Sequence, residues 1–155
     1  MVFVTVISKN GSLKETKFAG TNGDLYKKAG YRKNENFLER HTWRIKVDED
    51  YVYCKLWAKN EGRAGGENKY DLPPPIDTNL FYGSIIASLH SSKNSDAPDV
   101  DLKIVGWKKI YEGLFGGFHD IGDEDRAKKL GSNKPLSFGN IVILRFLCDP
   151  ESYIN

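Results

Sequence analysis

Two segments near the middle of the chain alternate between apolar and polar residues, which is the pattern of a half-buried β-strand. Residues 41–47 place their apolar side chains on one face, and residues 51–59 alternate again after the acidic segment 48–50. The pattern predicts a β-hairpin. One face of its second strand is aliphatic, and the other face holds Tyr51, Tyr53, Lys55 and Trp57. Either both faces of this strand are covered, or an aromatic surface is presented to a partner.

Four further runs predict strands, at residues 2–8, 13–18, 80–89 and 140–147. The first two are joined by Asn10-Gly11, a strong hairpin signal because both residues tolerate a positive φ. The third run is apolar on both faces around Gly83, which indicates a central strand.

An apolar period of 3.6 residues predicts the main helix, over about residues 104–116. The side chains on its apolar stripe are Trp107, Ile110, Tyr111, Leu114, Phe115 and Phe118. Two glycines at positions 116 and 117 would end this helix. A shorter helix is expected between Asp24, as its N-cap, and Gly30, as its C-terminal stop.

These elements indicate an α+β fold: a small, mainly antiparallel β-sheet domain packed by one amphipathic helix, with long loops and a C-terminal extension. We expect a single domain over residues 1–122. The extension, residues 123–155, is ordered either alone or only against partners. The longest predicted loop, residues 60–78, contains three consecutive prolines, which cannot join a strand ladder. A loop of this length inside a compact domain is often functional.

The composition is that of a soluble globular chain. The 155 residues are 39% hydrophobic and 28% charged, and their formal net charge is +2. A strongly basic nucleic-acid binder is therefore excluded. No apolar run approaches the ~18 residues that a membrane span needs, so we expect none. The two cysteines, Cys54 and Cys148, lack the C-x-x-C spacing of zinc and redox motifs and fit a reducing compartment; a disulfide between them is open but not required.

Motifs that carry catalysis or metal binding are absent from the sequence. The three histidines are isolated from one another, at His41, His90 and His119. Ser84, Ser88 and His90 fall on one face of a predicted strand, without the G-x-S-x-G elbow of a hydrolase. The glycine-rich stretch 62–66 lacks the lysine of a P-loop, and the acidic stretch 123–125 lacks EF-hand spacing. We therefore expect no enzymatic activity, no cofactor and no metal.

A basic stretch with interleaved aromatic residues runs from residue 26 to residue 46. Its cations are Lys27, Lys28, Arg32, Lys33, Arg40, Arg44 and Lys46, and its rings are Tyr26, Tyr31, Phe37 and Trp43. Basic and stacking groups together can bind single-stranded nucleic acid. The alternative is that Glu35 and Glu39 partly balance the charge and that the aromatic residues serve the core.

Three motifs occur in order within residues 20–122. They are Arg40-His41-Thr42-Trp43, the segment from Glu67 to Asp77 followed by Phe81-Tyr82-Gly83, and the segment from Trp107 to Phe118. Together they resemble an uncharacterised conserved protein family of the nucleocytoplasmic large DNA viruses, found among phycodnaviruses and mimivirus-like giants. Members look like small α+β domains, often followed by a long acidic tail. This chain departs from that pattern after residue 125, where basic and apolar residues follow.

The resemblance implies a viral protein that is made in the cytoplasm of an infected host cell. From it we expect a non-enzymatic virion structural protein of a large icosahedral double-stranded DNA virus. As a minor capsid protein of the capsid shell, it would brace or cement capsomers, with the major capsid protein and other minor capsid proteins as partners. The alternative is a viral nucleic-acid-binding or transcription-associated accessory factor that uses residues 26–46.

Candidate protein-interface residues come from the predicted hairpin, the 60–79 loop and the 123–155 extension, since a proline-rich loop and a terminal extension can reach neighbours. They are Trp57, Arg63, Tyr70, Pro73, Pro74, Pro75, Phe138, Phe146 and Tyr153. Aromatic residues make up 12% of the chain, and such side chains are enriched at protein interfaces.

Overall fold

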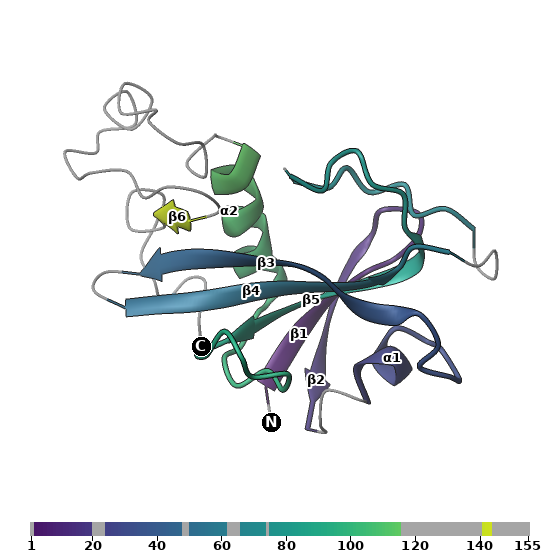
Figure 1. Cartoon of the computed structure of the whole chain (residues 1–155), viewed down its shortest axis with the longest axis horizontal. Helices are drawn as coiled ribbons and strands as arrows, with labels where there is room; N and C mark the ends of the chain where they lie inside the picture. The colour runs from purple at the N-terminus through teal and green to yellow at the C-terminus, as the bar shows by residue number, and fades with distance from the viewer. Residues whose placement is uncertain are drawn as a thin grey trace.

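A six-stranded sheet with the strand order β2-β1-β5-β4-β3-β6 forms the frame of the protein (Figure 1). The computed structural model describes residues 2–19, 24–47, 50–61, 66–73, 75–115 and 141–143. The elements are β1 (Val2–Ile7), β2 (Leu13–Phe18), α1 (Leu25–Lys28), β3 (Phe37–Val47), β4 (Asp50–Lys59), β5 (Tyr82–His90), α2 (Ile104–Phe115) and β6 (Ile141–Ile143). Neighbouring strands pair antiparallel except β6, which pairs parallel with β3. The predicted α+β class is confirmed.

The predicted central hairpin is β3–β4, but β3 begins at Phe37 and not at residue 41. The two strands stay in register on either side of a β-bulge between Glu39 and His41. The extra residue, Arg40, donates from Nε to the Ala58 carbonyl oxygen (2.8 Å) and from Nη2 to that of Asn36 (2.6 Å). Because the bulge breaks the two-residue period, the alternation becomes visible in the sequence only from residue 41 onward.

The hairpin expected around Asn10-Gly11 is β1–β2, and its turn spans residues 8–12. The Ser8 amide donates to the Ser12 carbonyl oxygen (2.9 Å), and the Asn10 side chain accepts from the Ser12 amide (3.0 Å). Of the two turn residues, only Gly11 has a positive φ, of 90°. The turn is therefore longer than a two-residue hairpin loop, and its one left-handed position is the glycine.

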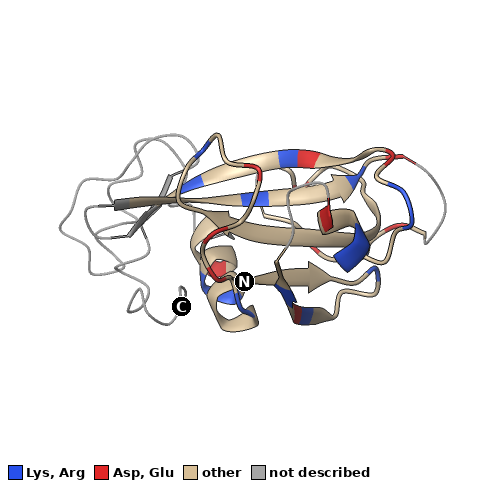
Figure 2. Ribbon diagram, turned by 90° about the horizontal axis from the view of Figure 1, so that it is seen from below, with Lys and Arg blue, Asp and Glu red and all other residues tan. Residues whose placement is uncertain are grey.

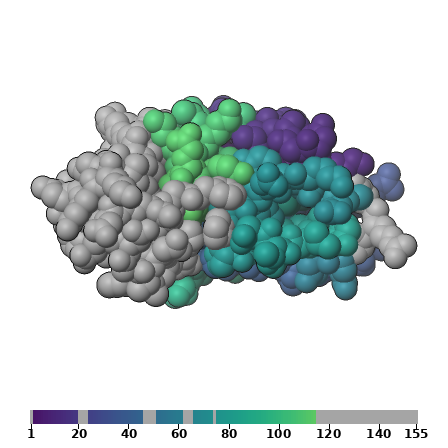
Figure 3. Space-filling model, turned by 90° about the horizontal axis from the view of Figure 1, so that it is seen from above, coloured from purple at the N-terminus to yellow at the C-terminus, as the bar shows by residue number. Residues whose placement is uncertain are grey.

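The first sheet face carries the larger core and is covered by α2 and by the segment 66–81. Trp43 from β3, Leu56 from β4, Ile85 from β5 and Trp107 from α2 all belong to this cluster and are fully buried. The helix and the segment lie side by side on the surface (Figure 3). They are joined by the Trp107 indole N–H, which donates to the Tyr70 hydroxyl (2.9 Å).

The second sheet face carries a smaller core, which α1 and the residues after it cover. Leu25 packs there with Phe37 and Ile86. The expected N-cap, Asp24, makes no capping hydrogen bond from its side chain and instead lies 3.6 Å from the Lys27 ammonium. Gly30 has a φ of 90° and ends the helix as predicted.

The predicted apolar stripe of the main helix packs on the first face. Trp107, Ile110 and Leu114 are fully buried, and the Tyr111 hydroxyl donates to the Asp71 carbonyl oxygen (2.6 Å). The side chains of Phe115 and Phe118 lie outside the described residues. β5 pairs with β1 on one side and β4 on the other, which confirms the central strand predicted for residues 80–89.

Removing the Trp107 side chain tests the packing of α2. Replacing Trp107 with alanine deletes a fully buried ring, so the free energy of unfolding should fall by roughly 3–5 kcal/mol. The control is Val105→Ala on the same helix, where the side chain is 51% exposed and the change should stay within about 0.5 kcal/mol. Urea unfolding followed by circular dichroism gives both values, and equal losses would contradict the assignment of the buried stripe.

Candidate functional site

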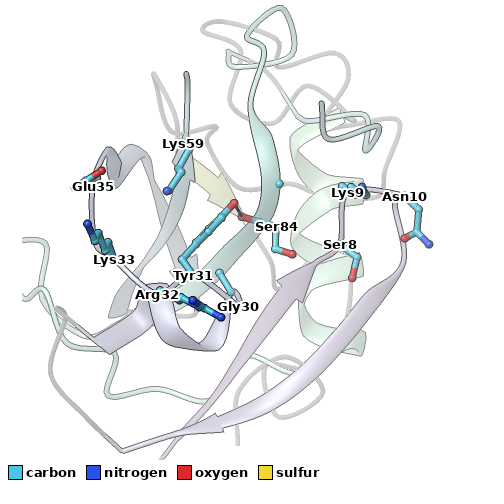
Figure 4. Close-up of a pocket in the computed structure, with 12 residues that line it drawn as sticks. Ser8, Lys9, Asn10, Gly30, Tyr31, Arg32, Lys33, Glu35, Lys59 and Ser84 are labelled. Atoms are coloured by element: carbon cyan, nitrogen blue, oxygen red, sulfur yellow. Dashed lines mark hydrogen bonds between the residues drawn. The ribbon is translucent and has the colours of Figure 1, made fainter. Parts of the chain in front are cut away.

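A groove of about 770 Å³ opens between the β1–β2 turn and the segment after α1 (Figure 4). Its floor is the start of β5, at Gly83 and Ser84, and the end of β4 contributes Lys59. The lining consists of Ser8, Lys9, Asn10, Ala29, Gly30, Tyr31, Arg32, Lys33, Glu35, Lys59, Gly83 and Ser84. The site therefore draws on four separate stretches of the sequence.

The groove forms because β1 and β5 diverge beyond the pair of Ile7 with Ile85. A buried side chain, Asn68, ties the two strands there in place of a ladder. Its amide nitrogen donates to the carbonyl oxygens of Ile7 (3.1 Å) and Gly83 (2.8 Å). The next residue fixes the rim of the groove, since the Lys69 amide donates to the Lys9 carbonyl oxygen (2.7 Å).

The side chains around the groove carry an excess of positive charge. Lys9, Arg32, Lys33 and Lys59 are cationic, and Glu35 is the one carboxylate among the described residues of the lining. A shallower hollow beside it brings Glu61 near Lys59 as well. Elsewhere in the described chain, basic and acidic positions are interspersed along strands and loops (Figure 2). A concave site with clustered cations favours an anionic ligand.

Tyr31 is fixed in the floor of the groove through its hydroxyl. The single proton of that hydroxyl is shared between the carbonyl oxygens of Tyr82 (2.9 Å) and Ser84 (3.2 Å), which flank Gly83. Gly83 has a φ of +71°, and a Cβ there would collide with the Tyr31 hydroxyl. Burial raises the pKa of Tyr31 above its usual value, against the opposing effect of the hydrogen bond at Ser84, so the hydroxyl keeps its proton near pH 7.

The ring of Tyr31 is also contacted by its neighbours. The Lys59 ammonium lies 4.3 Å from the ring centroid, and the Phe37 ring lies 5.5 Å away at an interplanar angle of 53°. Figure 4 shows Lys59 reaching toward this ring. A cation held over an aromatic face is placed more firmly than a free surface lysine.

The structure divides the basic and aromatic stretch 26–46 among different tasks. Arg32 and Lys33 line the groove, whereas the Arg40 guanidinium is held by backbone carbonyls in the bulge of β3. Phe37 and Trp43 are buried in the two cores. The stretch is therefore not one binding surface, and the expectation that its aromatic residues serve the core holds for these two rings.

Lys9 and Lys59 are the groove cations that sequence reasoning missed. Lys9 follows β1, and Lys59 ends β4, about 50 positions later along the chain. Nothing in the local sequence distinguishes either residue from a solvated lysine. The one usable signal was Gly83 in an apolar strand, since a glycine there often marks the close approach of another group.

A second candidate is the predicted cluster of Ser84, Ser88 and His90 on one strand face. Ser84 lines the groove, whereas Ser88 and His90 belong to a buried hydrogen-bond chain with Trp57. The Trp57 indole N–H donates to Ser88 Oγ (2.9 Å), which lies 2.7 Å from His90 Nε2. Ser88 and His90 are both fully buried. Because the serine oxygen accepts from Trp57 and is sealed from solvent, this pair is built as a structural contact and not as an open nucleophile.

The segment 91–99 covers the hydrogen-bonded pair of Ser88 and His90 and is anchored by a buried cation. Lys55 is 2% exposed, and its ammonium lies 2.9 Å from Glu39 Oε1 and donates to the Ser95 carbonyl oxygen (2.8 Å). Asp99 holds the start of the segment by accepting from the amide and the hydroxyl of Ser91. A buried charge is tolerated when its partners are in place, as they are here.

Burial and the nearby Lys55 charge lower the pKa of His90 to about 4. The backbone of Ala97 and the carboxylates of Asp99 and Glu39 act in the opposite direction but do not outweigh them. His90 is therefore neutral at pH 7. Its Nδ1 has no hydrogen-bond partner of normal geometry among the described residues, which is a further reason why a protonated ring is disfavoured here.

The proposed interface residues lie in different environments. Trp57 is 4% exposed, so as an exposed contact it is a wrong assignment: the second face of β4 is covered at this point. Pro73 is buried, Tyr70 is half-buried and Pro75 is exposed. The remaining candidates, Arg63, Pro74, Phe138, Phe146 and Tyr153, lie outside the described residues.

The described ranges also bear on metal, redox and membrane chemistry. No cluster of three histidine, cysteine or acidic side chains there could hold a metal ion. Cys54 is a free thiol whose pKa is raised by burial, and Cys148 lies outside those ranges. None of the helices within the same ranges is long and apolar enough to cross a bilayer.

Comparison of the chain with protein-family models, with curated proteins and with solved structures finds no significant match. The resemblance to a family of large DNA viruses thus stays a prediction from three sequence motifs.

The lowered pKa of His90 predicts that the protein loses stability in mild acid. This pKa is about 4 in the folded state and about 6.5 in the unfolded state, so between these values the unfolded chain binds a proton that the folded chain does not. The free energy of unfolding should therefore fall as the pH drops from 6.5 to 4, by at most about 1.4 kcal/mol per pH unit from this group. Urea unfolding at several pH values measures the slope. A His90→Gln variant should flatten it, and equal slopes would contradict the assignment.

Proposed function

We propose that the protein is a non-enzymatic nucleic-acid-binding protein and that its groove holds phosphate groups of a single nucleic-acid strand. The observation that carries this proposal is the composition of the groove. Among the described residues, four cationic side chains and one carboxylate line it, and this local excess of three positive charges exceeds the net charge of +2 of the whole chain. Phosphate contacts supply most of the affinity of sequence-independent nucleic-acid binding.

The near-neutral chain supports a localised mode of binding. A strongly basic protein attracts nucleic acid over much of its surface, whereas this chain has 23 basic and 21 acidic side chains. Attraction therefore depends on where the cations gather. In the groove they surround a floor of backbone and a tyrosine hydroxyl that keeps its proton, with Glu35 as the opposing charge in the lining.

The number of cations also limits the strength of binding. With at most four phosphate contacts on a single strand, the logarithm of the association constant should fall with the logarithm of salt concentration with a slope of about −3. Dissociation constants in the range of about 10⁻⁴ to 10⁻⁶ M are typical of such sequence-independent sites at physiological salt. This is the affinity of an accessory factor that works beside other contacts.

A role as a virion structural protein is the second candidate, and the segment 66–81 favours it. This segment presents Leu80, which is 57% exposed, together with exposed Pro75 and half-buried Tyr70. Its sequence is also one of the motifs that resemble the viral family. The proposal is that this surface contacts capsid proteins in the shell of a large double-stranded DNA virus, assembled in the cytoplasm of the infected cell.

Neutralising the groove should weaken nucleic-acid binding. We expect Arg32→Gln combined with Lys33→Gln to lose two phosphate contacts, to lower the salt slope by about 1.4 and to weaken affinity roughly 10- to 30-fold at 0.1 M salt. Fluorescence anisotropy with a labelled single-stranded oligonucleotide over a salt series measures both. The matched control is Lys93→Gln with Lys108→Gln, which removes the same charge at two exposed positions outside the groove. Equal losses in the two double variants would contradict a role for the groove.

The capsid role is tested on purified virions. Quantitative mass spectrometry before and after the internal DNA core is stripped should show the protein retained with the capsid shell at near-stoichiometric amounts. A Leu80→Asp variant, whose charge lies on the exposed surface, should be incorporated less well while remaining folded. Loss of the protein with the core, or its absence from particles, would contradict this role.

A further inference from the structure

We infer that the groove binds the sugar–phosphate backbone of a nucleic acid and leaves the bases in solvent. This inference rests on the proposed function, since it specifies how the same groove takes its ligand. Its basis is the state of the one aromatic ring in the lining. Tyr31 is the sole aromatic residue among the described residues around the groove. Its hydroxyl is tethered to the strand below, and its ring is already in contact with other side chains, so the ring is not free to stack on a base.

The hydroxyl fixes the orientation of Tyr31. It shares its proton between two backbone carbonyl oxygens of β5, at Tyr82 and Ser84, and it occupies the space where a Cβ on Gly83 would stand. A ring tethered in this way cannot rotate out toward a base without losing both contacts and exposing two strand carbonyls. Tyr31 is therefore part of the floor.

Two neighbours already contact the ring of Tyr31 and restrict the room in which a base could stack. Lys59 Nζ lies 4.3 Å from the centroid, and the Phe37 ring packs against Tyr31 at 5.5 Å. Phe37 is itself buried in the smaller core, so it cannot move aside. A base would have to displace Lys59, so it would lose the contact of its phosphate with this cation when it gained a stacking contact with Tyr31. A phosphate can bind to Lys59 in its present position.

Lys59 is consequently the cation that the structure places best for a phosphate. Its ammonium is held over the ring of Tyr31, while Lys9, on the turn, and Arg32 and Lys33, on the segment after α1, also line the groove. Tyr31 acts on the ligand through Lys59 and is a positioning residue. The groove should then bind strands irrespective of their base sequence, because every nucleotide carries the same phosphodiester.

An abasic strand provides the direct test. Anisotropy competition should give affinities within about twofold for oligothymidylate and for an abasic oligonucleotide of the same length. Stacking of even one base would favour the thymidylate strand by roughly 5- to 160-fold, and that result would overturn the inference. Inorganic phosphate at matched ionic strength should not displace the strand, because it spans too few of the cations. Displacement would indicate a site for a free anion and would also overturn the backbone assignment.

Variants at Lys59 and Tyr31 test the positioning role. Lys59→Gln should lower the salt slope by about 0.7, the value of one phosphate contact, and Tyr31→Leu should lower it by the same amount without touching a charge. Tyr31→Phe loses the hydroxyl contacts but keeps a ring that packs against Phe37 and lies under Lys59, so it should keep the slope, provided that its thermal unfolding shows a folded protein. An unchanged slope in Lys59→Gln would overturn the assignment of this cation.

The two proposals fail in different ways. If the Arg32 and Lys33 double variant binds as tightly as the natural protein, the groove is not a nucleic-acid site and the backbone inference falls with it. If that double variant binds more weakly but abasic strands lose affinity, the groove binds nucleic acid through its bases, and the backbone inference alone is overturned.

Discussion

The fold depends on the burial of both faces of its two central strands. From Ile85 to His90 every residue of β5 is buried, and β4 is buried without a break from residue 54 to residue 58. Neither strand can therefore face water, and each side of the sheet needs a cover. On the first face, α2 and the segment 66–81 supply it with apolar side chains. On the second, the cover is made of separate pieces: α1 with the residues after it, and the segment 91–99.

The pieces of the second cover differ in chemistry because the strands beneath them do. Around Leu25 the sheet offers apolar side chains, and a hydrophobic cluster suffices. Toward the end of β5 it offers Ser88, His90 and Lys55, whose burial requires hydrogen bonds and counter-charges. The segment 91–99 supplies hydrogen-bond acceptors from its backbone and counter-charges from its carboxylates. Ser88 and His90, which resemble a catalytic pair in the sequence, are thus buried structural residues. Lys55 fastens the segment to the sheet through the Ser95 carbonyl oxygen.

The sequence predicted the elements that depend on a regular period, and it missed features that depend on contacts between distant segments. The buried stripe of α2 and the hairpin of β3 and β4 follow from spacing alone. Trp57 alternates like a surface residue, but the hydroxyl of Ser88 on the neighbouring strand gives its indole a buried partner. The groove could not be predicted from local sequence, because Lys9 and Lys59 come to line one groove with Arg32 only when β1, β4 and the residues after α1 are packed together.

The two proposed surfaces are connected through one buried side chain. Asn68 belongs to the segment whose other end presents Leu80, and its amide joins β1 to β5 at the head of the groove. The neighbouring Lys69 amide holds the turn that carries Lys9. A partner that displaces the segment 66–81 would therefore also release the rim of the groove, whereas one that docks on it as it stands would leave the cations in place. Contacts with capsid proteins and with nucleic acid are thus compatible on this chain when the partner binds the segment in its folded position.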